Sequence, residues 1–369
     1  MAEQLLQSNK DIQDIQQNSI NLLKELIRIP SFSKLEEKTA TVISIFLQSN
    51  GIPFGRYMNN IWAVNKYFDP GKPTILLNSH HDTVQPNGGY TIDPYTPSEK
   101  EGKLFGLGSN DAGGCLVSLL GTFIYFYQRS DLTYNIVLAA TAEEEISGHD
   151  GIEALLKEAA FNKYLVNNVC AIVGEPTKMQ MAVAEKGLLV LDCISHGVAG
   201  HAARMEGDNA IYKAINDINW FQAFRFANVS EFLGPVKMSV TSIQTANKAH
   251  NVVPEECRFV VDIRINELYT FEEVIDTIRE NIKSEVAPRS TRLRSSSIPD
   301  DHPLVQAGTL LGKKSYGSPT TSDKALMEFP SLKMGPGDSA RSHSADEFIY
   351  LQEIREGIST YIDLLNQLV

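Results

Sequence analysis

The stretch that most constrains the fold is residues 74–84, TILLNSHHDTV, in which apolar and β-branched residues run directly into two histidines and an aspartate. This pattern predicts a buried strand that ends in ionisable side chains. In open α/β sheets, ligands bind in the crevice beyond the carboxyl ends of the strands. On an extended backbone, His80 and Asp82 project to one side and His81 to the other. A polar turn without function is the alternative interpretation of this stretch alone.

The same arrangement, a buried strand followed by a polar residue and a helix, recurs along the first half of the chain. Besides His80, the ionisable residues at these positions are Asp111, Glu143, Glu144, Glu145 and Glu175. They recur about every thirty residues, which is the length of one βαβ unit. Right-handed crossovers bring such strand ends to the same edge of a sheet. We therefore predict that these side chains share one site.

This predicted site has the chemistry of a metal centre. Its candidate ligands are His80, Asp111, Glu145, Glu175 and, late in the chain, His343. Such a mixed N/O set suits Zn²⁺ and tolerates Co²⁺ or Mn²⁺. Five ligands exceed the needs of one tetrahedral zinc, but with one bridging carboxylate they fit two ions about 3.5–4 Å apart. Amide hydrolysis by a metal-activated water also needs a general base, and Glu144, which is beside Glu145 but is not a ligand, is the candidate.

The pattern of elements predicts two domains of different class. Residues 1–178 and 298–369 have the alternation of strands and helices typical of an α/β domain with a mostly parallel central sheet. After residue 177 the pattern of apolar and polar residues changes. Residues 181–194 alternate apolar and polar side chains as in one long antiparallel strand. We interpret residues 179–297 as an α+β domain inserted into the first.

Composition and charge argue against several function classes. A formal net charge of −12 argues against general binding of nucleic acid or anionic membranes. No apolar run approaches the roughly eighteen residues that suggest a membrane span, and residues 1–14 lack the regions of a signal peptide. The four scattered cysteines indicate reduced thiols in a cytoplasmic protein. The glycine-rich turn at residues 104–114 lacks the motifs of a nucleotide site.

Taken together and in this order, the motifs resemble the co-catalytic zinc aminoacylases, acetylornithine deacetylases and related carboxypeptidases. The resemblance covers nearly the whole chain. It rests on residues 80–84 (HHDTV), 108–114 (GSNDAGG), 143–145 (EEE) and 174–177 (GEPT), and on His343. The departures are small: Asn110 before the predicted bridging aspartate, Ala112 after it, and Glu143 in place of the usual aspartate.

The resemblance assigns a role to each of these residues. It implies that His80 and Glu175 bind one metal ion and that Glu145 and His343 bind the other. Asp111 would bridge the two ions. It also implies that Asp82 orients His80 and that Glu144 is the general base.

The resemblance extends to the inserted segment. It implies that this segment is a lid domain and that two chains form a homodimer through it. His201, in the Gly-x-x-x-His motif of residues 197–201, would help to stabilise the developing oxyanion, in its own or a neighbouring subunit's site. The alternative is a surface histidine in a glycine-rich turn. Asn251 and Arg264 resemble substrate contacts, although an ion pair with Asp262 is an alternative for the arginine. Arg341, close to His343, would also suit a carboxylate.

We therefore predict a metal-dependent amidohydrolase that acts on a small N-acyl amino acid. Residues 335–338 (GPGD) near His343 most resemble acetylornithine deacetylases, which implies removal of an acetyl group from ornithine or citrulline, in arginine biosynthesis. The alternatives are a desuccinylase, a di- or tripeptidase, and a metal-binding protein without turnover. Glu144 argues against the last, because a binding module has no use for a base beside its ligands.

Overall fold

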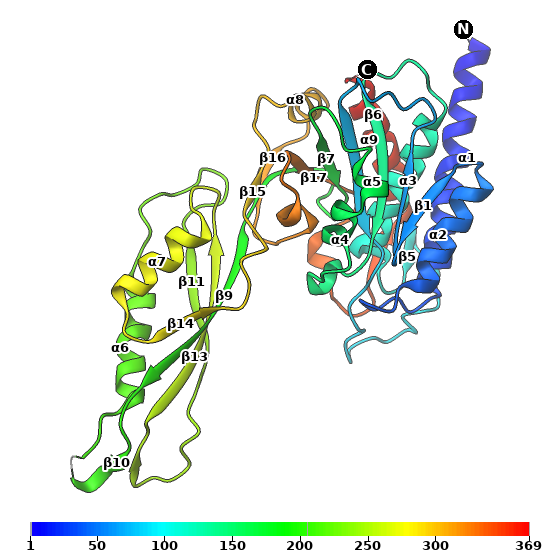
Figure 1. The fold of residues 1–369 in the computed structure, drawn as a ribbon. Coiled ribbons are helices and arrows are strands. Elements are labelled where there is room, and N and C mark those ends of the chain that lie inside the picture. The colour runs from blue at the N-terminus through cyan, green and yellow to red at the C-terminus, as the bar shows by residue number, and fades with distance from the viewer. Residues whose placement is uncertain (1, 205, 369) are drawn as a thin grey trace. The chain divides into compact units, whose positions relative to one another are not determined.

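The computed structural model describes residues 2–204 and 206–368 (Figure 1). These residues form two compact units. The first unit contains the chain up to Val183, the segment Ile298–Tyr316 and the chain from Ser322 onward. The second unit contains Ala184–Ser297 and the short segment Gly317–Thr321.

The first unit is built around a mixed sheet with strand order β1-β2-β6-β3-β7-β17-β8. Its central strands are parallel to one another, and they are β6 (Asn135–Thr141), β3 (Thr74–His80), β7 (Cys170–Val173) and β17 (Ser331–Lys333). Antiparallel strands flank this centre, namely β1 (Phe54–Tyr57), β2 (Asn60–Val64) and β8 (Met181–Glu185), with β16 (Ser315–Ser318) and β15 (Ser296–Ser297) paired to β8. The predicted α/β class is confirmed, with the parallel pairing confined to the centre.

Helices cover both faces of the central strands, which explains why every residue of β3 and β6 is buried. On one face, α3 (Gly114–Tyr127) packs on β3 and β6 and is covered by α1 (Ala2–Ile27) and α9 (Leu351–Asn366) (Figure 1). On the other face, α4 (Ile152–Lys157) and α5 (Ala159–Asn162) pack their apolar side chains against Leu76 and Val137. This segment thus forms two short helices, separated at Glu158.

The remaining elements of the first unit lie around this core. α2 (Glu37–Ser49) contacts β1 and β2, and α8 (Pro303–Leu310) contacts α9. A small antiparallel sheet consists of β4 (Ser98–Lys100), β5 (Lys103–Phe105) and β18 (Phe348–Tyr350). Among the described residues, no helix is both long enough and apolar enough to cross a membrane.

The second unit has an antiparallel sheet with helices on one face. The strand order is β11 (Lys237–Gln244), β13 (Glu256–Ile265), β9 (Gly187–His196) and β14 (Glu285–Pro288). Every second residue of β9 and β13 is buried, and these side chains pack against α6 (Ala210–Ala223) and α7 (Phe271–Asn281). Beside this sheet, β10 (Gly200–His201) pairs with β12 (Val252–Val253).

The prediction of one long strand at residues 181–194 is wrong. The chain forms two strands, β8 and β9, on either side of Lys186. β8 is buried at every residue and belongs to the mixed sheet, whereas β9 alternates between buried and half-buried residues in the antiparallel sheet. The second unit accordingly begins at Ala184, while the predicted inserted segment begins at residue 179.

Candidate metal centre

The parallel strands deliver the candidate ligands to one edge of the sheet. β3 ends at His80, which lies opposite Thr141 at the end of β6. The short helix η2 (Glu144–Ile146) begins three residues after Thr141, and β7 ends two residues before Glu175. Asp111 lies in the glycine-rich turn that leads into α3.

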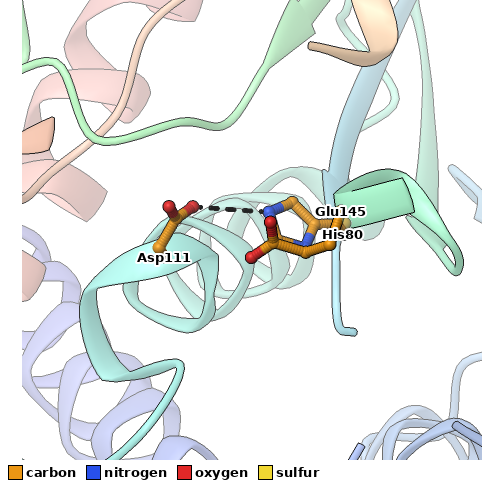
Figure 2. Close-up of side chains that lie close together, drawn as sticks. All are labelled: His80, Asp111 and Glu145. Carbon is orange, nitrogen blue, oxygen red and sulfur yellow. Dashed lines mark ion pairs between the residues drawn. The ribbon is translucent and has the colours of Figure 1, made fainter. Parts of the chain in front are cut away.

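Asp111 lies between two histidines. Its Oδ1 is 3.5 Å from Nε2 of His80 and its Oδ2 is 3.7 Å from Nε2 of His343. Each histidine also faces a glutamate: His80 Nε2 is 3.7 Å from Oε1 of Glu175, and His343 Nε2 is 3.0 Å from Oε2 of Glu145. Figure 2 shows His80, Asp111 and Glu145 together, with the His80–Asp111 pair marked. The structure therefore brings the five predicted ligands to one place, with Asp111 in the middle.

The surroundings of His80 fit a metal ligand. Its Nδ1 is 3.0 Å from the backbone carbonyl oxygen of Asp82. Because a carbonyl oxygen only accepts, Nδ1 carries the proton, and in the neutral ring Nε2 has a free lone pair. That buried Nε2 has no hydrogen-bond partner, although three carboxylates surround it. A divalent cation would satisfy the lone pair and offset the repulsion between the carboxylates, so these residues fit bound metal ions.

The carboxylates shift the titration of both histidines. The hydrogen bond with Glu145 raises the pKa of His343 to about 9. Burial lowers the pKa of His80, but the neighbouring carboxylates of Asp111, Asp82 and Glu144 raise it by more, so the pKa is well above its usual value. Without a metal, the His343 ring therefore carries a positive charge at neutral pH.

Glu144 lies among the ligands and has an unusual environment. Its Oε2 is 3.8 Å from Nε2 of His80, almost the same distance as Oε1 of Glu175. Burial raises the pKa of Glu144 well above its usual value, and the negative charges of Glu175 and Asp323 raise it further, while His80 lowers it. Potential ligand atoms of His80, Glu144 and Glu175 all lie within 4.8 Å of one another. Glu144 is therefore close enough to the predicted ligands to act either as the predicted base or as a ligand itself.

Asp82 contacts more than His80. Its Oδ1 is 3.4 Å from Nδ1 of His80 and accepts the backbone N–H of Glu144 at 3.1 Å. Its Oδ2 accepts the backbone N–H of Glu145 at 3.1 Å and the hydroxyl of Ser33 at 2.7 Å. One buried carboxylate thus connects the first histidine to the segment that carries the predicted base.

The glycine-rich turn receives a carboxylate from the chain itself. The Glu347 side chain, in a residue that is 2% exposed, accepts the backbone N–H groups of Gly108, Asn110 and Asp111 at 3.1, 2.7 and 2.9 Å. Gly108 has a φ of 73°, in the left-handed region that suits glycine. Burial raises the pKa of Glu347 to about 8. The N–H groups of this glycine-rich turn are therefore bound by a side chain of the protein itself.

Sequence reasoning missed Glu347 and a second buried acid, Asp323. The Oδ2 of Asp323 accepts hydrogen bonds at 2.8 Å from Asn78 in β3 and from Thr141 in β6. Burial raises the pKa of Asp323 to about 6. Asp323 follows no strand and belongs to no motif, so nothing in the sequence marks it. The position of Glu347 four residues after His343 was the available indication.

The predicted residues of the second unit have contacts of their own. His201 and Asn251 are exposed. The Nδ1 atom of His201 accepts a hydrogen bond from the backbone N–H of Ala203 at 3.2 Å. The backbone carbonyl of Asn251 accepts a hydrogen bond from the backbone N–H of Ala202 at 3.0 Å. Arg264 donates two hydrogen bonds to Asp262, at 2.9 and 3.0 Å. The ion pair considered as the alternative for Arg264 is therefore present, and the functional roles of these residues stay predictions.

Arg341, in the first unit, is also paired. Its guanidinium donates to both oxygens of Glu353, at 2.7 and 2.9 Å. It also lies over the ring of Phe348, 4.8 Å from the ring centroid. These contacts hold the segment just before His343 against β18 and α9, and substrate binding by Arg341 stays a prediction.

Comparison with known proteins gives three findings. The model of the peptidase family M20/M25/M40 matches residues 76–367. The chain is 28% identical to acetylornithine deacetylase of Proteus mirabilis (strain HI4320), over 93% of this chain and 96% of that protein. It is 26% identical to succinyl-diaminopimelate desuccinylase 2 of Ruegeria sp. (strain TM1040), over 72% of this chain and 69% of that protein.

The fold is also similar to solved structures. The YXEP protein of Bacillus subtilis, a dinuclear metal-binding peptidase of the M20 family, superimposes with a TM-score of 0.73 at 16% identity, over 96% of this chain and 98% of that chain. At this identity the likeness concerns the fold.

Proposed function

The chain belongs to peptidase family M20/M25/M40 and is a hydrolase of N-acyl amino acids or peptides, and we propose that it removes an N-acyl group from an amino acid. The observation that carries this proposal is the position of Asp111, whose two carboxylate oxygens each face a histidine. This arrangement suits a pair of divalent ions, and such a pair is well matched to hydrolysis of an unactivated amide.

The ligands would divide into two sets. His80 and Glu175 would hold one ion, Glu145 and His343 the other, and Asp111 would contact both. The approach of Glu175 to His80, at 3.7 Å, and of Glu145 to His343, at 3.0 Å, supports this division. The N/O ligand set favours Zn²⁺, with Co²⁺ or Mn²⁺ as alternatives. When bound, the ions supply positive charge that polarises the amide carbonyl and lowers the pKa of water.

Glu144 would be the general base of this reaction. Its carboxylate would accept a proton from the attacking water and deliver it to the leaving nitrogen. The raised pKa of Glu144 supports this role, because a carboxyl group that holds a proton more readily serves both transfers. Asp82 would act on the same step by holding His80 and the backbone of Glu144.

Other residues would contact the substrate or the developing charge. His201 would donate a hydrogen bond to the oxyanion, in its own or a partner subunit's site. Asn251, Arg264 and Arg341 would contact the substrate. Each arginine would then exchange its present carboxylate partner for a carboxylate of the substrate.

The acyl group and the amino acid are the finer part of the proposal. Acetyl removal from ornithine or citrulline, in arginine biosynthesis, is supported by the similarity to acetylornithine deacetylase along nearly the whole chain. Removal of a succinyl group is supported equally by the similarity to a desuccinylase. A di- or tripeptidase is the further alternative, because the family includes peptidases. A metal-binding protein without turnover is disfavoured by the carboxyl of Glu144, which lies beside the ligands and has a raised pKa.

We also propose a homodimer formed through the second unit and a cytoplasmic location. The dimer rests on the family resemblance. The location is supported by four buried cysteines, none in a disulfide among the described residues, which suit a reducing compartment.

An assay panel before and after chelation tests the proposed activity. The panel contains acetylornithine, acetylcitrulline, their succinyl counterparts and a set of di- and tripeptides. We expect hydrolysis of one acyl class, loss of that activity after chelation, and recovery when Zn²⁺ is added back. Activity that survives complete removal of metal would refute the proposal, and preference for a peptide would replace the deacylase by the peptidase.

A further inference from the structure

We propose that Glu347 is a positioning residue for the metal centre, and that its carboxylate fixes the turn carrying Asp111 relative to His343. The proposal rests on the proposed metal site. The Glu347 side chain acts on the backbone of the turn: it accepts the backbone N–H groups of Asp111, Asn110 and Gly108.

The first step of the argument is the shape of the turn. The left-handed conformation of Gly108 helps to turn the N–H groups of Gly108, Asn110 and Asp111 toward one point. Converging backbone N–H groups form a site for an anion. Glu347 fills that site with both carboxyl oxygens: Oε1 accepts the N–H groups of Asn110 and Asp111, and Oε2 accepts that of Gly108.

The second step is the place of Glu347 in the chain. It lies four residues after His343 and directly before β18, and its own carbonyl accepts the N–H of Gly106 at 3.0 Å. Asp111 and His343 therefore approach each other at their side chains, 3.7 Å apart, and are joined a second time through the Glu347 side chain. A shift of the turn would move the bridging carboxylate relative to the second histidine.

The third step is the neighbouring residue, which offers a matched control. The Asp346 carboxylate also accepts three hydrogen bonds, from the N–H and hydroxyl of Thr91 and from the N–H of Ile92. These donors lie in an exposed loop without any predicted ligand. Glu347 and Asp346 thus accept the same number of hydrogen bonds from adjacent positions in the chain. Only the hydrogen bonds of Glu347 go to the turn that carries a predicted metal ligand.

The experiment compares Glu347→Ala with Asp346→Ala. Metal-free wild type and variants are titrated with Zn²⁺ by calorimetry, and amide hydrogen exchange is measured at residues 108–111 in the metal-free proteins. Removing a group that orients a metal ligand typically weakens metal binding about 10- to 100-fold. We expect that loss, with faster exchange at residues 108–111, for Glu347→Ala and affinity close to wild type for Asp346→Ala.

A conservative variant keeps the test decisive if Glu347→Ala fails to fold. In Glu347→Gln the amide oxygen still accepts from Asn110 and Asp111, but its NH₂ group faces the N–H of Gly108, so we expect an intermediate affinity. Zn²⁺ affinity equal to wild type in the folded Glu347 variants would overturn the positioning role. Wild type that binds no Zn²⁺ would instead overturn the proposed metal centre itself.

Discussion

At the scale of single residues, the geometry of the site depends on the contacts between carboxylates and imidazoles. Asp111 presents one oxygen to His80 and the other to His343, and the backbone carbonyl of Asp82 fixes which nitrogen of His80 carries the proton. The remaining nitrogen of His80 is buried without a hydrogen-bond partner. This combination is unfavourable for a protein alone and favourable for one that binds cations.

The first prediction concerns Glu144. We expect Glu144→Ala to keep both metal ions but to lose about 10²–10⁴-fold in kcat, because the proton transfer loses its base. Metal content per chain and steady-state kinetics are measured on the same preparation. A variant that loses an ion together with its activity would identify Glu144 as a ligand, and near-normal turnover would remove it from the mechanism.

The second prediction concerns protons released on metal binding. A histidine must lose its proton before it binds a metal, and the pKa of His343 is raised to about 9 in the metal-free site. Apparent metal affinity should therefore increase from pH 6 to about 9 and level off above the pKa of His343. Calorimetry in two buffers of different ionisation enthalpy measures the protons released. Binding that releases none at pH 7 would contradict the raised pKa values.

The sequence could predict the site residues that end buried strands and could not predict those that support them. His80, Glu145 and Glu175 follow apolar runs, so their placement follows from the strand pattern. Glu347 and Asp323 do not follow a buried strand directly. Their importance depends on the backbone and side-chain donors that surround them in the fold. Those donors come from distant segments, and a pattern along the chain does not contain them.

At the scale of elements, the turn between β5 and α3 is tightly packed around Gly113. A side chain at Gly113 would place its Cβ 2.4 Å from the carbonyl oxygen of Gly108 and 2.6 Å from Leu23. The space around Gly113 is therefore occupied on one side by the backbone of the turn itself and on the other by Leu23 of α1. The turn holds Asp111 through packing as well as through Glu347.

The third prediction tests this packing with a pair of glycine substitutions. Gly113→Ala should destabilise the metal-free protein by about 1–3 kcal/mol, the usual cost of overpacking. Gly88→Ala is the matched control, since a Cβ there meets nothing within 4 Å. Urea unfolding measures both. Equal midpoints for the two variants would show that the turn can move without cost.

Element boundaries could be predicted where a pattern is uniform and not where two environments meet. β6 is an example of the first kind, because it is apolar from Ile136 to Ala140 and buried throughout. The stretch across Lys186 looks continuous in hydropathy, yet its first part is buried on both faces and its second part on one. Which sheet a strand joins depends on neighbours such as β17 that lie far along the chain.

At the scale of the whole molecule, all five predicted ligands belong to the first unit, although the chain leaves that unit for more than a hundred residues before His343. The last ligand returns with the segment from Ser322 onward. Metal binding would thus tie the two ends of an interrupted domain together.

The fourth prediction follows from this arrangement. Ions that bind the folded first unit stabilise it, by about 2.7 kcal/mol for each site at a free concentration one hundred times the Kd. Calorimetric scans should therefore show one transition that moves to higher temperature with Zn²⁺. A transition of the second unit, which holds no predicted ligand, should not move. Equal shifts of all transitions, or none, would contradict this assignment.

The most direct test of the two-ion centre is anomalous diffraction from crystals grown with Zn²⁺. We predict two zinc peaks on either side of the Asp111 carboxylate, one beside His80 and Glu175 and the other beside Glu145 and His343. A map with no peak at Asp111, or with zinc held only by other residues, would contradict the account.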